Sequence, residues 1–172
     1  MASLVLTAIG DDRAGLVNAL ADVIAEHDGN WERSQMAELA GKFAGIVLVT
    51  VPDTRVDGFR DALRPLSGVL DVQVAVGGDQ ITDAQHFSLH LLGNDRPGIV
   101  RELSGVLARH GVNIDELSTE TWDAPMAGGM LFEADAMLEA PADLDEATLR
   151  VALESVAQEL MVDIELDTDL SP

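Results

Sequence analysis

The segments Ile9-Gly10-Asp11-Asp12-Arg13-Ala14-Gly15-Leu16-Val17 and Leu92-Gly93-Asn94-Asp95-Arg96-Pro97-Gly98-Ile99-Val100 are two copies of one pattern, 83 residues apart in a chain of 172. Each copy follows an apolar run typical of a strand and precedes a run with helical spacing. At a strand–loop–helix junction with a glycine, backbone N–H groups can hold a small anion or zwitterion. The pattern therefore indicates a duplicated small-molecule-binding module.

The duplication extends beyond these loops. When residues 3–51 are placed on residues 86–134 without a gap, 14 of the 49 pairs are identical, where average composition gives roughly three by chance. The period is far longer than that of a solenoid repeat, so we expect tandem domains at 1–77 and 86–172 with a linker at 78–85. The identical pairs are Leu6/Leu89, Gly10/Gly93, Asp12/Asp95, Arg13/Arg96, Gly15/Gly98, Val17/Val100, Leu20/Leu103, Val23/Val106, Ala25/Ala108, His27/His110, Asn30/Asn113, Ala44/Ala127, Gly45/Gly128 and Leu48/Leu131.

The hydrophobic periodicity predicts the same order of elements in each half. The expected strands are 3–9, 30–39, 46–51 and 69–76, then 86–92, 113–122, 129–138 and 161–166, with turns at 41–45 and 124–128. The expected helices are 14–27, 54–66, 97–111 and 144–159. The order β-α-β-β-α-β predicts an α+β fold, two ferredoxin-like antiparallel sheets with helices on one face and strands 1 and 3 central. The first strand-to-helix loop is expected beside the start of strand 2.

Charge and composition exclude several classes of protein. The net charge is −21, with −6 on residues 1–80 and −15 on residues 81–172, so direct nucleic-acid binding is unfavourable. The charge is explained by solubility or by a basic protein partner. There is no cysteine, which excludes disulfides, thiol nucleophiles and zinc thiolate sites. Because there is no basic leader and no apolar run of ~18 residues, we expect a soluble, cytoplasmic chain without membrane contact.

The second half resembles the ACT domain in two motifs. These are Asn94-Asp95-Arg96-Pro97-Gly98-Ile99-Val100 after the first strand and His110-Gly111-Val112-Asn113-Ile114 after the first helix. The first half is a looser match, because Ala14 replaces the proline and Asp28-Gly29-Asn30-Trp31 replaces the second motif. The resemblance implies regulatory modules that bind amino acids at interfaces between domains.

A pair of such domains without a catalytic domain is similar to the glycine cleavage system transcriptional repressor family. That similarity implies a small amino acid effector and a protein partner such as a transcriptional activator or a regulated enzyme. We also expect the two copies to pack as an intramolecular pseudo-dimer, and two small halves with a sheet edge each favour a further homodimer. No cofactor is expected.

An amino acid ligand needs donors for its carboxylate and acceptors for its ammonium group. The backbone N–H groups of Arg96 and Gly98 can donate, assisted by the helix dipole, Asp95 or Asp12 can accept, and an asparagine that starts strand 2 can do both across an interface. The candidate ligand-binding residues are Gly10, Asp11, Asp12, Arg13, Gly15 and Asn30 in the first copy, and Gly93, Asn94, Asp95, Arg96, Pro97, Gly98, Asn113 and Ile114 in the second.

Structural roles explain the same residues equally simply. Asp12 and Asp95 can cap the following helix, and the arginines can pair with a neighbouring carboxylate. Gly15 and Gly98 can serve close packing of helix on strand, and asparagine suits turns and left-handed backbone.

Neither a metal site nor a catalytic site is predicted. His86 and His90 share a strand face, but a third ligand such as Asp83 has no recognised motif spacing. Arg96 and Asn113 loosely fit an acylphosphatase-like hydrolase, yet no activated nucleophile, P-loop or dinucleotide fingerprint is present. We therefore expect a non-enzymatic sensor, with a ligand-independent acidic adaptor as the alternative.

Overall fold

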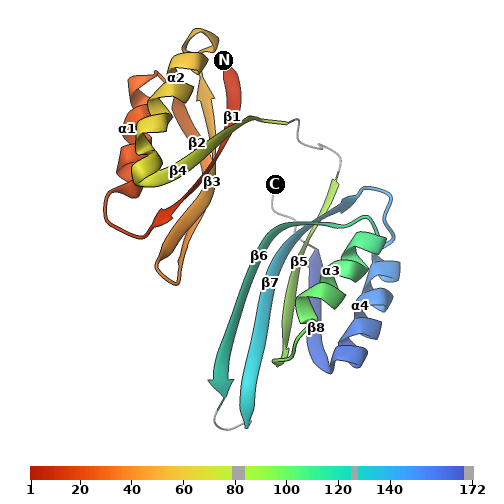
Figure 1. Cartoon of the computed structure of the whole chain (residues 1–172). Helices are drawn as coiled ribbons and strands as arrows, with labels where there is room; N and C mark the ends of the chain where they lie inside the picture. The colour runs from red at the N-terminus through yellow and green to blue at the C-terminus, as the bar shows by residue number, and fades with distance from the viewer. Residues whose placement is uncertain (79–83, 125–127, 169–172) are drawn as a thin grey trace. The chain divides into compact units, whose positions relative to one another are not determined.

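The computed structural model describes residues 1–78, 84–124 and 128–168, and its contacts divide the chain into two compact units, Met1–Gln80 and Ile81–Pro172. Each unit follows the order β-α-β-β-α-β (Figure 1). The first contains β1 (Ala2–Asp11), α1 (Leu16–Glu26), β2 (Asn30–Leu39), β3 (Lys42–Val51), α2 (Val56–Leu63) and β4 (Leu70–Val76). The second contains β5 (Ala84–Asn94), α3 (Ile99–Arg109), β6 (Asn113–Ala124), β7 (Gly129–Pro141), α4 (Glu146–Leu160) and β8 (Val162–Thr168).

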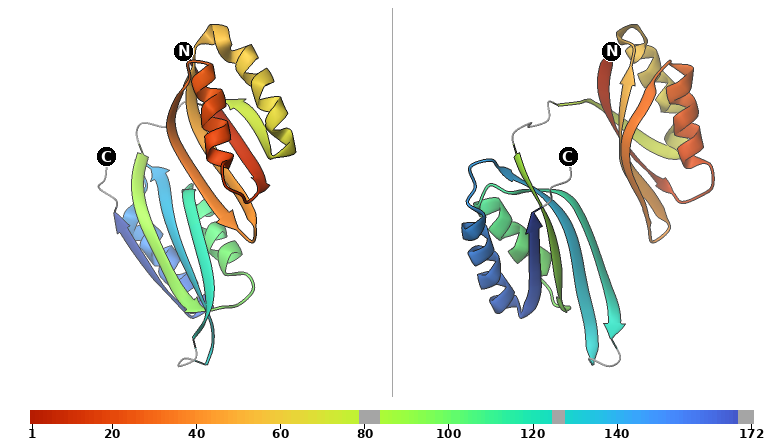
Figure 2. Two further views of the ribbon diagram at one scale, coloured as in Figure 1. Left: turned by 90° about the vertical axis from the view of Figure 1, so that its left-hand side faces the viewer. Right: turned by 180° about the vertical axis from the view of Figure 1, so that it is seen from behind.

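Both sheets have the predicted topology. The strand orders are β2-β3-β1-β4 and β6-β7-β5-β8, and every pair is antiparallel. Strands 1 and 3 of each unit are central, and both helices of each unit cover one face of its sheet (Figure 2). The predicted α+β, ferredoxin-like fold is confirmed.

The core of each unit lies between the sheet and its two helices. Alternate strand residues point toward the helices, and the apolar stripe of each helix closes over them. We call the opposite side the outer face of each sheet. It bears Thr7 and Ile46 in the first unit, and His90 and Asp135 in the second. The buried cores include Leu4, Leu6, Leu20, Val49 and Phe59 in the first unit and Phe87, Leu91, Leu107, Leu138 and Leu149 in the second.

The hairpin that joins strands 2 and 3 is longer in the second unit. Gly10 of β1 pairs with Phe43, and Gly93 of β5 pairs with Phe132. Phe43 and Phe132 are therefore equivalent, although they are not 83 residues apart. The ungapped alignment fails beyond this hairpin, so the identities Gly45/Gly128 and Leu48/Leu131 do not join equivalent positions. Ala127, the partner of Ala44 in that alignment, lies outside the described residues.

Several element boundaries differ from the prediction. β3 begins at Lys42, not at residue 46, and Gly45 lies inside it rather than in a turn. A Cβ at Gly45 would overlap the side chain of Met36, so this glycine makes room for Met36 on the core side. Residues 54–66 form α2 flanked by the 3-10 turns Asp53–Arg55 and Arg64–Gly68, not one helix.

The predicted linker and the second predicted turn fall partly outside the described residues. Residues 79–83 of the linker are outside them, and the last two linker residues, Ala84 and Gln85, belong to β5. Residues 125–127 of the expected turn at 124–128 are also outside. Within the described ranges no helix is both long and apolar enough to span a membrane.

Candidate functional site

Both repeated loops end in a glycine with left-handed backbone. Gly15 (φ 96°) precedes α1 and Gly98 (φ 100°) precedes α3, and neither helix has a side-chain cap. The helices therefore begin two residues later than predicted, and Pro97 lies before the first turn of α3. Asp12 and Asp95 do not cap their helices, so that structural explanation is wrong. No side chain caps the first-turn N–H groups of these two helices, which have no partner within the helix.

The glycines of each loop have two different structural roles. At Gly15 and Gly98 no atom lies within 4 Å of a built Cβ, so their requirement is the left-handed conformation and not helix–strand packing. Gly10 and Gly93 have the packing role instead. A Cβ would overlap the Val69 carbonyl oxygen at Gly10 and the Val162 side chain at Gly93. Packing is thus sufficient to explain glycine at both positions, and their place in a ligand site stays a prediction.

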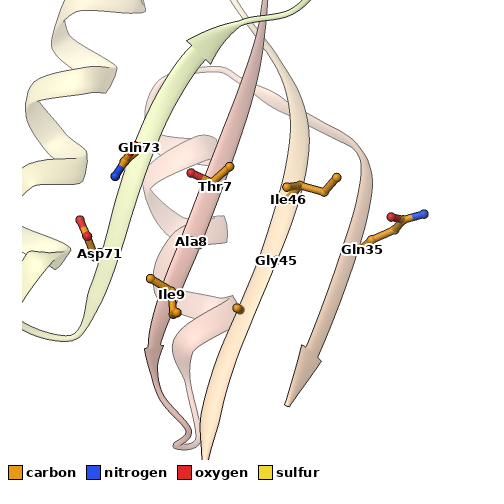
Figure 3. A pocket seen from close by; sticks show the side chains of 9 residues that line it. Thr7, Ala8, Ile9, Gln35, Gly45, Ile46, Asp71 and Gln73 are labelled. Carbon is orange, nitrogen blue, oxygen red and sulfur yellow. The ribbon is translucent and has the colours of Figure 1, made fainter. Parts of the chain in front are cut away.

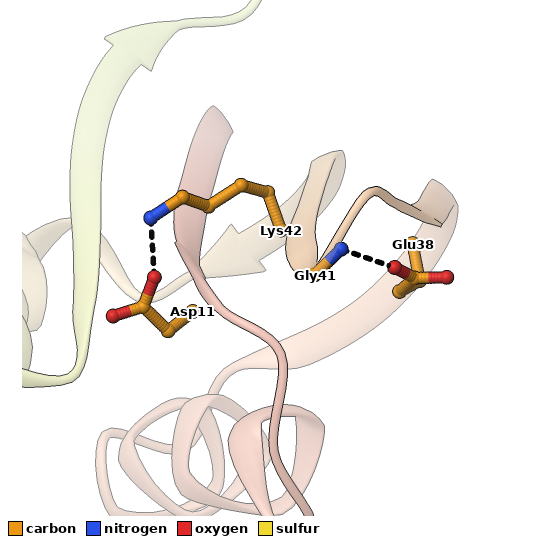
Figure 4. Close-up of polar contacts among 4 residues, drawn as sticks. All are labelled: Asp11, Glu38, Gly41 and Lys42. Atoms are coloured by element: carbon orange, nitrogen blue, oxygen red, sulfur yellow. Dashed lines mark hydrogen bonds and ion pairs between the residues drawn. The ribbon is translucent and has the colours of Figure 1, made fainter.

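Backbone and side-chain contacts hold the first loop against the β2–β3 hairpin. The N–H of Asp12 donates to the carbonyl oxygen of Gly41 (2.9 Å), and the N–H of Gly41 donates to Glu38 Oε1 (2.6 Å). Asp11 forms an ion pair with Lys42 across β1 and β3 (Figure 4). The hydrogen bond from Lys42 lowers the pKa of Asp11. Asp11 therefore already has a cationic partner, which weakens its case as a ligand residue.

The arginines of the two loops lie in different surroundings. Arg13 is exposed, and within the described part of the chain no side-chain hydrogen bond or ion pair includes it. Arg96 is half-buried, and its Nη2 donates to the carbonyl oxygen of Glu159 (3.1 Å), near the end of α4. Among the described carboxylates, neither arginine has an ion-pair partner. The expected arginine–carboxylate pair is therefore wrong for both copies.

A hollow of about 220 Å³ lies over the first loop. Its floor is the start of α1, and Phe43 of β3 forms its apolar side. The hollow brings one guanidinium, one carboxylate and the uncapped helix start to a single place. Its lining residues are Asp12, Arg13, Gly15, Leu16, Val17, Asn18 and Phe43.

The predicted asparagines lie at the opposite end of each sheet from the loops. Asn30 pairs with Thr50, the partner of Ser3, and from Ser3 to Asp11 the strand rises about 27 Å. The expectation that the loop lies beside the start of strand 2 is wrong, because the crossover helix returns the chain to the end where strand 1 began.

The same separation applies in the second unit. Asn113 pairs with Glu139, the partner of His86, and Ile114 packs against the core. Arg96 and Asn113, the pair considered for an acylphosphatase-like site, are therefore not brought together.

Sequence analysis missed a second hollow, on the outer face of the first sheet. It has a volume of about 450 Å³, and neutral side chains dominate it (Figure 3). Thr7 and Ile9 of β1 and Ile46 of β3 lie at its centre. Short side chains such as Thr7 and Ala44 leave this space open. The alternation of residues along a strand predicts which side chains share a face, but it does not predict a hollow on that face. Its lining residues are Thr7, Ala8, Ile9, Gln35, Ala44, Gly45, Ile46, Asp71 and Gln73.

The histidines of β5 have carboxylate neighbours that sequence analysis did not find. Asp83, considered as a third ligand, lies outside the described residues. His90 Nδ1 lies 2.8 Å from Asp135 Oδ1, and His90 Nε2 lies 3.6 Å from Glu133 Oε1. The hydrogen bond to Asp135 is the main cause of a raised pKa for His90. These groups come from different strands, so their spacing in the sequence carries no motif.

Comparison with known proteins places the chain in a family. Residues 2–77 and 85–167 match the family model described as the ACT domain. The chain belongs to the ACT domain family. Both ACT domains coincide with the two units described above, and the strand-to-helix loops lie inside the matched segments.

Individual relatives match the chain over most of its length. The glycine cleavage system transcriptional repressor of Escherichia coli is 25% identical over 162 residues, which cover 91% of this chain and 85% of the repressor. A solved structure of an unknown protein from Galdieria sulphuraria is 33% identical, with a TM-score of 0.89 over 98% of this chain and 99% of the other. A putative glycine cleavage system transcriptional repressor has a TM-score of 0.73 at 17% identity over 98% and 97% of the two chains, which shows the fold alone.

Proposed function

We propose that this chain is a regulatory protein that binds a small amino acid at its ACT-domain loops and acts through a protein partner. The observation that carries the proposal is the hollow over the first loop, where Arg13 and Asp12 meet the uncapped start of α1. The 25% identity with the Escherichia coli glycine cleavage repressor over most of both chains supports a role in regulation.

The hollow matches the charges of an amino acid. A carboxylate placed at the start of α1 would accept from the first-turn N–H groups and from the Arg13 guanidinium. Asp12 would accept from the ammonium group. A volume of about 220 Å³ lies below the 300–1,000 Å³ typical of drug-sized pockets, which favours a small side chain on the effector.

The first copy is the better candidate of the two. Arg96 would have to leave the Glu159 carbonyl before it could bind an effector, whereas Arg13 has no such bond to break. Asn30, Asn113 and Ile114 remain candidates only for a contact across an interface, because each lies at the far end of its own sheet. An effector would alter partner binding only if it favoured one conformation over another.

A panel of thermal-shift melts tests this function. The full chain is melted with each of the twenty amino acids at millimolar concentration, since a ligand at ~100 times its Kd adds ~2.7 kcal/mol to the folded state. We expect one or two related amino acids to raise the Tm by several degrees.

Two matched variants then locate the site. Arg13→Gln should abolish the shift, and Arg96→Gln should lower the basal Tm but preserve the shift. A shift that survives in Arg13→Gln would place the effector elsewhere, and no shift with any amino acid would contradict amino acid sensing.

A ligand-independent adaptor is the second candidate function. It is favoured by the acidic outer face of the second sheet, where Glu133, Asp135 and Glu165 gather. Binding of a basic partner to that face should weaken steeply as ionic strength rises. Effector binding in the first loop should depend on salt much less.

A further inference from the structure

The outer face of the second sheet is strongly acidic and carries two histidines. Along the described strands β5 to β8 there is no lysine or arginine, so only His86 and His90 can supply positive charge there. The cross-strand pairing places these acidic residues on the same face: Glu116, Glu120, Glu133, Asp135, Glu139, Asp163, Glu165 and Asp167.

One cluster surrounds His90 in the centre of the sheet. Asp135 of β7 and Glu165 of β8 are the direct cross-strand partners of His90. Glu133 precedes Asp135 by two residues on β7 and so lies on the same face. One ligand atom each from His90, Glu133 and Asp135 lies within 4.8 Å of the others. Both carboxylates of this cluster thus come from β7, and Glu165 is the cross-strand partner of His90 on β8.

A second cluster repeats this composition four residues away along β5. His86, Glu139 and Asp115 also place their ligand atoms within 4.8 Å of one another. Glu139 is the direct partner of His86, and Asp115 lies at the β6 bulge, a feature that re-aims side chains. Asn113 Nδ2 donates to Asp115 Oδ1 (2.9 Å), which orients that carboxylate.

The negative charge of this face is poorly compensated. Glu120 of β6 lies directly opposite Glu133 of β7, and like charges in that position destabilise a strand pair. Among the described residues, His90 makes the only ion pairs recorded for this face. A bound cation would reduce the repulsion among these carboxylates.

We propose that the outer face of the second sheet binds two divalent transition-metal ions of the Zn²⁺ class, one at His90–Glu133–Asp135 and one at His86–Asp115–Glu139. Imidazole nitrogen with carboxylate oxygen suits Zn²⁺ and its neighbours better than Mg²⁺ or Ca²⁺, which take oxygen ligands. Three protein ligands leave a coordination position for water. This site is independent of the proposed effector loop, since it lies on other residues of another unit.

Titration of the metal-free full chain with Zn²⁺ tests the proposal. Isothermal calorimetry should show two ions bound per chain, and Co²⁺ in place of Zn²⁺ should give visible absorption bands typical of nitrogen and oxygen ligands. His90→Gln and His86→Gln should each remove one ion or weaken it at least about tenfold. Circular dichroism of each variant shows whether the fold is retained.

A variant outside both clusters separates specific binding from attraction to an acidic surface. Asp163→Asn with Asp167→Asn removes two carboxylates from the same face without touching either cluster, and it should retain both ions. The proposal is overturned if the native chain binds no zinc at micromolar concentration. It is equally overturned if the double histidine variant binds as the native chain does, or if the aspartate control loses as much as the histidine variants.

Discussion

Equivalent positions on the two outer faces carry opposite chemistry. Thr7 pairs with Ile46 and Gln73 in the first sheet, and His90 pairs with Asp135 and Glu165 in the second. The neutral hollow of the first unit thus occupies the place where the second unit has its histidine–carboxylate cluster.

The core faces of the same strands differ much less. Leu6 and Leu89 are identical and fully buried, and so are Leu20 and Leu103 of the covering helices. A buried position must fill a fixed volume, whereas an outer-face position must only remain compatible with a strand. The comparison shows that packing kept one side of the duplicated unit similar and left the other free to acquire a different chemistry.

Substitution of Gly10 and Gly93, the two glycines required by packing, tests this similarity and has the largest expected effect. Gly10→Ala should destabilise the first unit by about 3 kcal/mol, because the obstructing atom is a backbone oxygen that cannot rotate away. Gly93→Ala should cost a similar amount, because its obstacle is Cγ1 and Cβ of Val162, a β-branched side chain that cannot rotate clear. Urea unfolding resolves the units, because Trp31 reports the first and Trp122 the second.

A second-site change provides the control. Val162→Ala should partly rescue Gly93→Ala, whereas the first unit offers no side chain whose removal rescues Gly10→Ala. A Gly93→Ala variant that Val162→Ala does not rescue, or a Gly10→Ala variant without loss of stability, would contradict these contacts.

Much of this fold could be predicted from the sequence because each strand and helix carries its own periodicity. The apolar stripe of Leu16, Leu20 and Ile24 and the alternation of Leu4, Leu6 and Ala8 predict their elements locally. Gly45 could not be placed in the same way. Glycine is typical of turns, and only the cross-strand neighbour Met36 explains its place inside β3.

The helix-start glycines provide a medium-sized test in which the two units should agree. Gly15→Ala and Gly98→Ala should each cost about 1–2 kcal/mol, because a left-handed backbone is strained for alanine. No atom obstructs either Cβ. Because asparagine tolerates left-handed backbone better than alanine does, Gly15→Asn should be less destabilising than Gly15→Ala. A cost above about 3 kcal/mol at either position would indicate an unrecognised contact.

The loop arginines should separate the two units more weakly. Arg96→Gln should destabilise the second unit by about 1 kcal/mol, because it removes a charge-assisted hydrogen bond at the end of α4. Arg13→Gln should leave the stability of the first unit unchanged within about 0.5 kcal/mol. Urea titrations followed through the tryptophan of each unit measure both values, and equal losses would contradict the assigned difference.

The candidate site was less predictable than the fold, and the reason is geometric. The sequence identified the loops because their residues are contiguous. It wrongly predicted Asn30 and Asn113 beside the loops, because the crossover helix carries the chain back to the opposite end of the sheet. The His90 cluster was missed for the opposite reason. Glu133 and Asp135 lie near His90 only because β5 pairs with β7. They are more than 40 residues away in the sequence, and no motif links them to the histidine.

The smallest expected effect is the pH dependence at His90. Its pKa is raised above the ordinary 6.5 by the hydrogen bond to Asp135 and by nearby carboxylates, so the contribution of His90 to stability is full below about pH 6.5 and disappears as the pH rises through the folded-state pKa. His90→Asn should therefore lower the stability of the metal-free second unit at pH 6, by less than about 1 kcal/mol because the pair is exposed, and not at pH 9. Thr7→Asn is the matched change in the first unit and should show no difference between these pH values. Equal losses for His90→Asn at both would mean that packing of the ring, rather than its charge, stabilises this face.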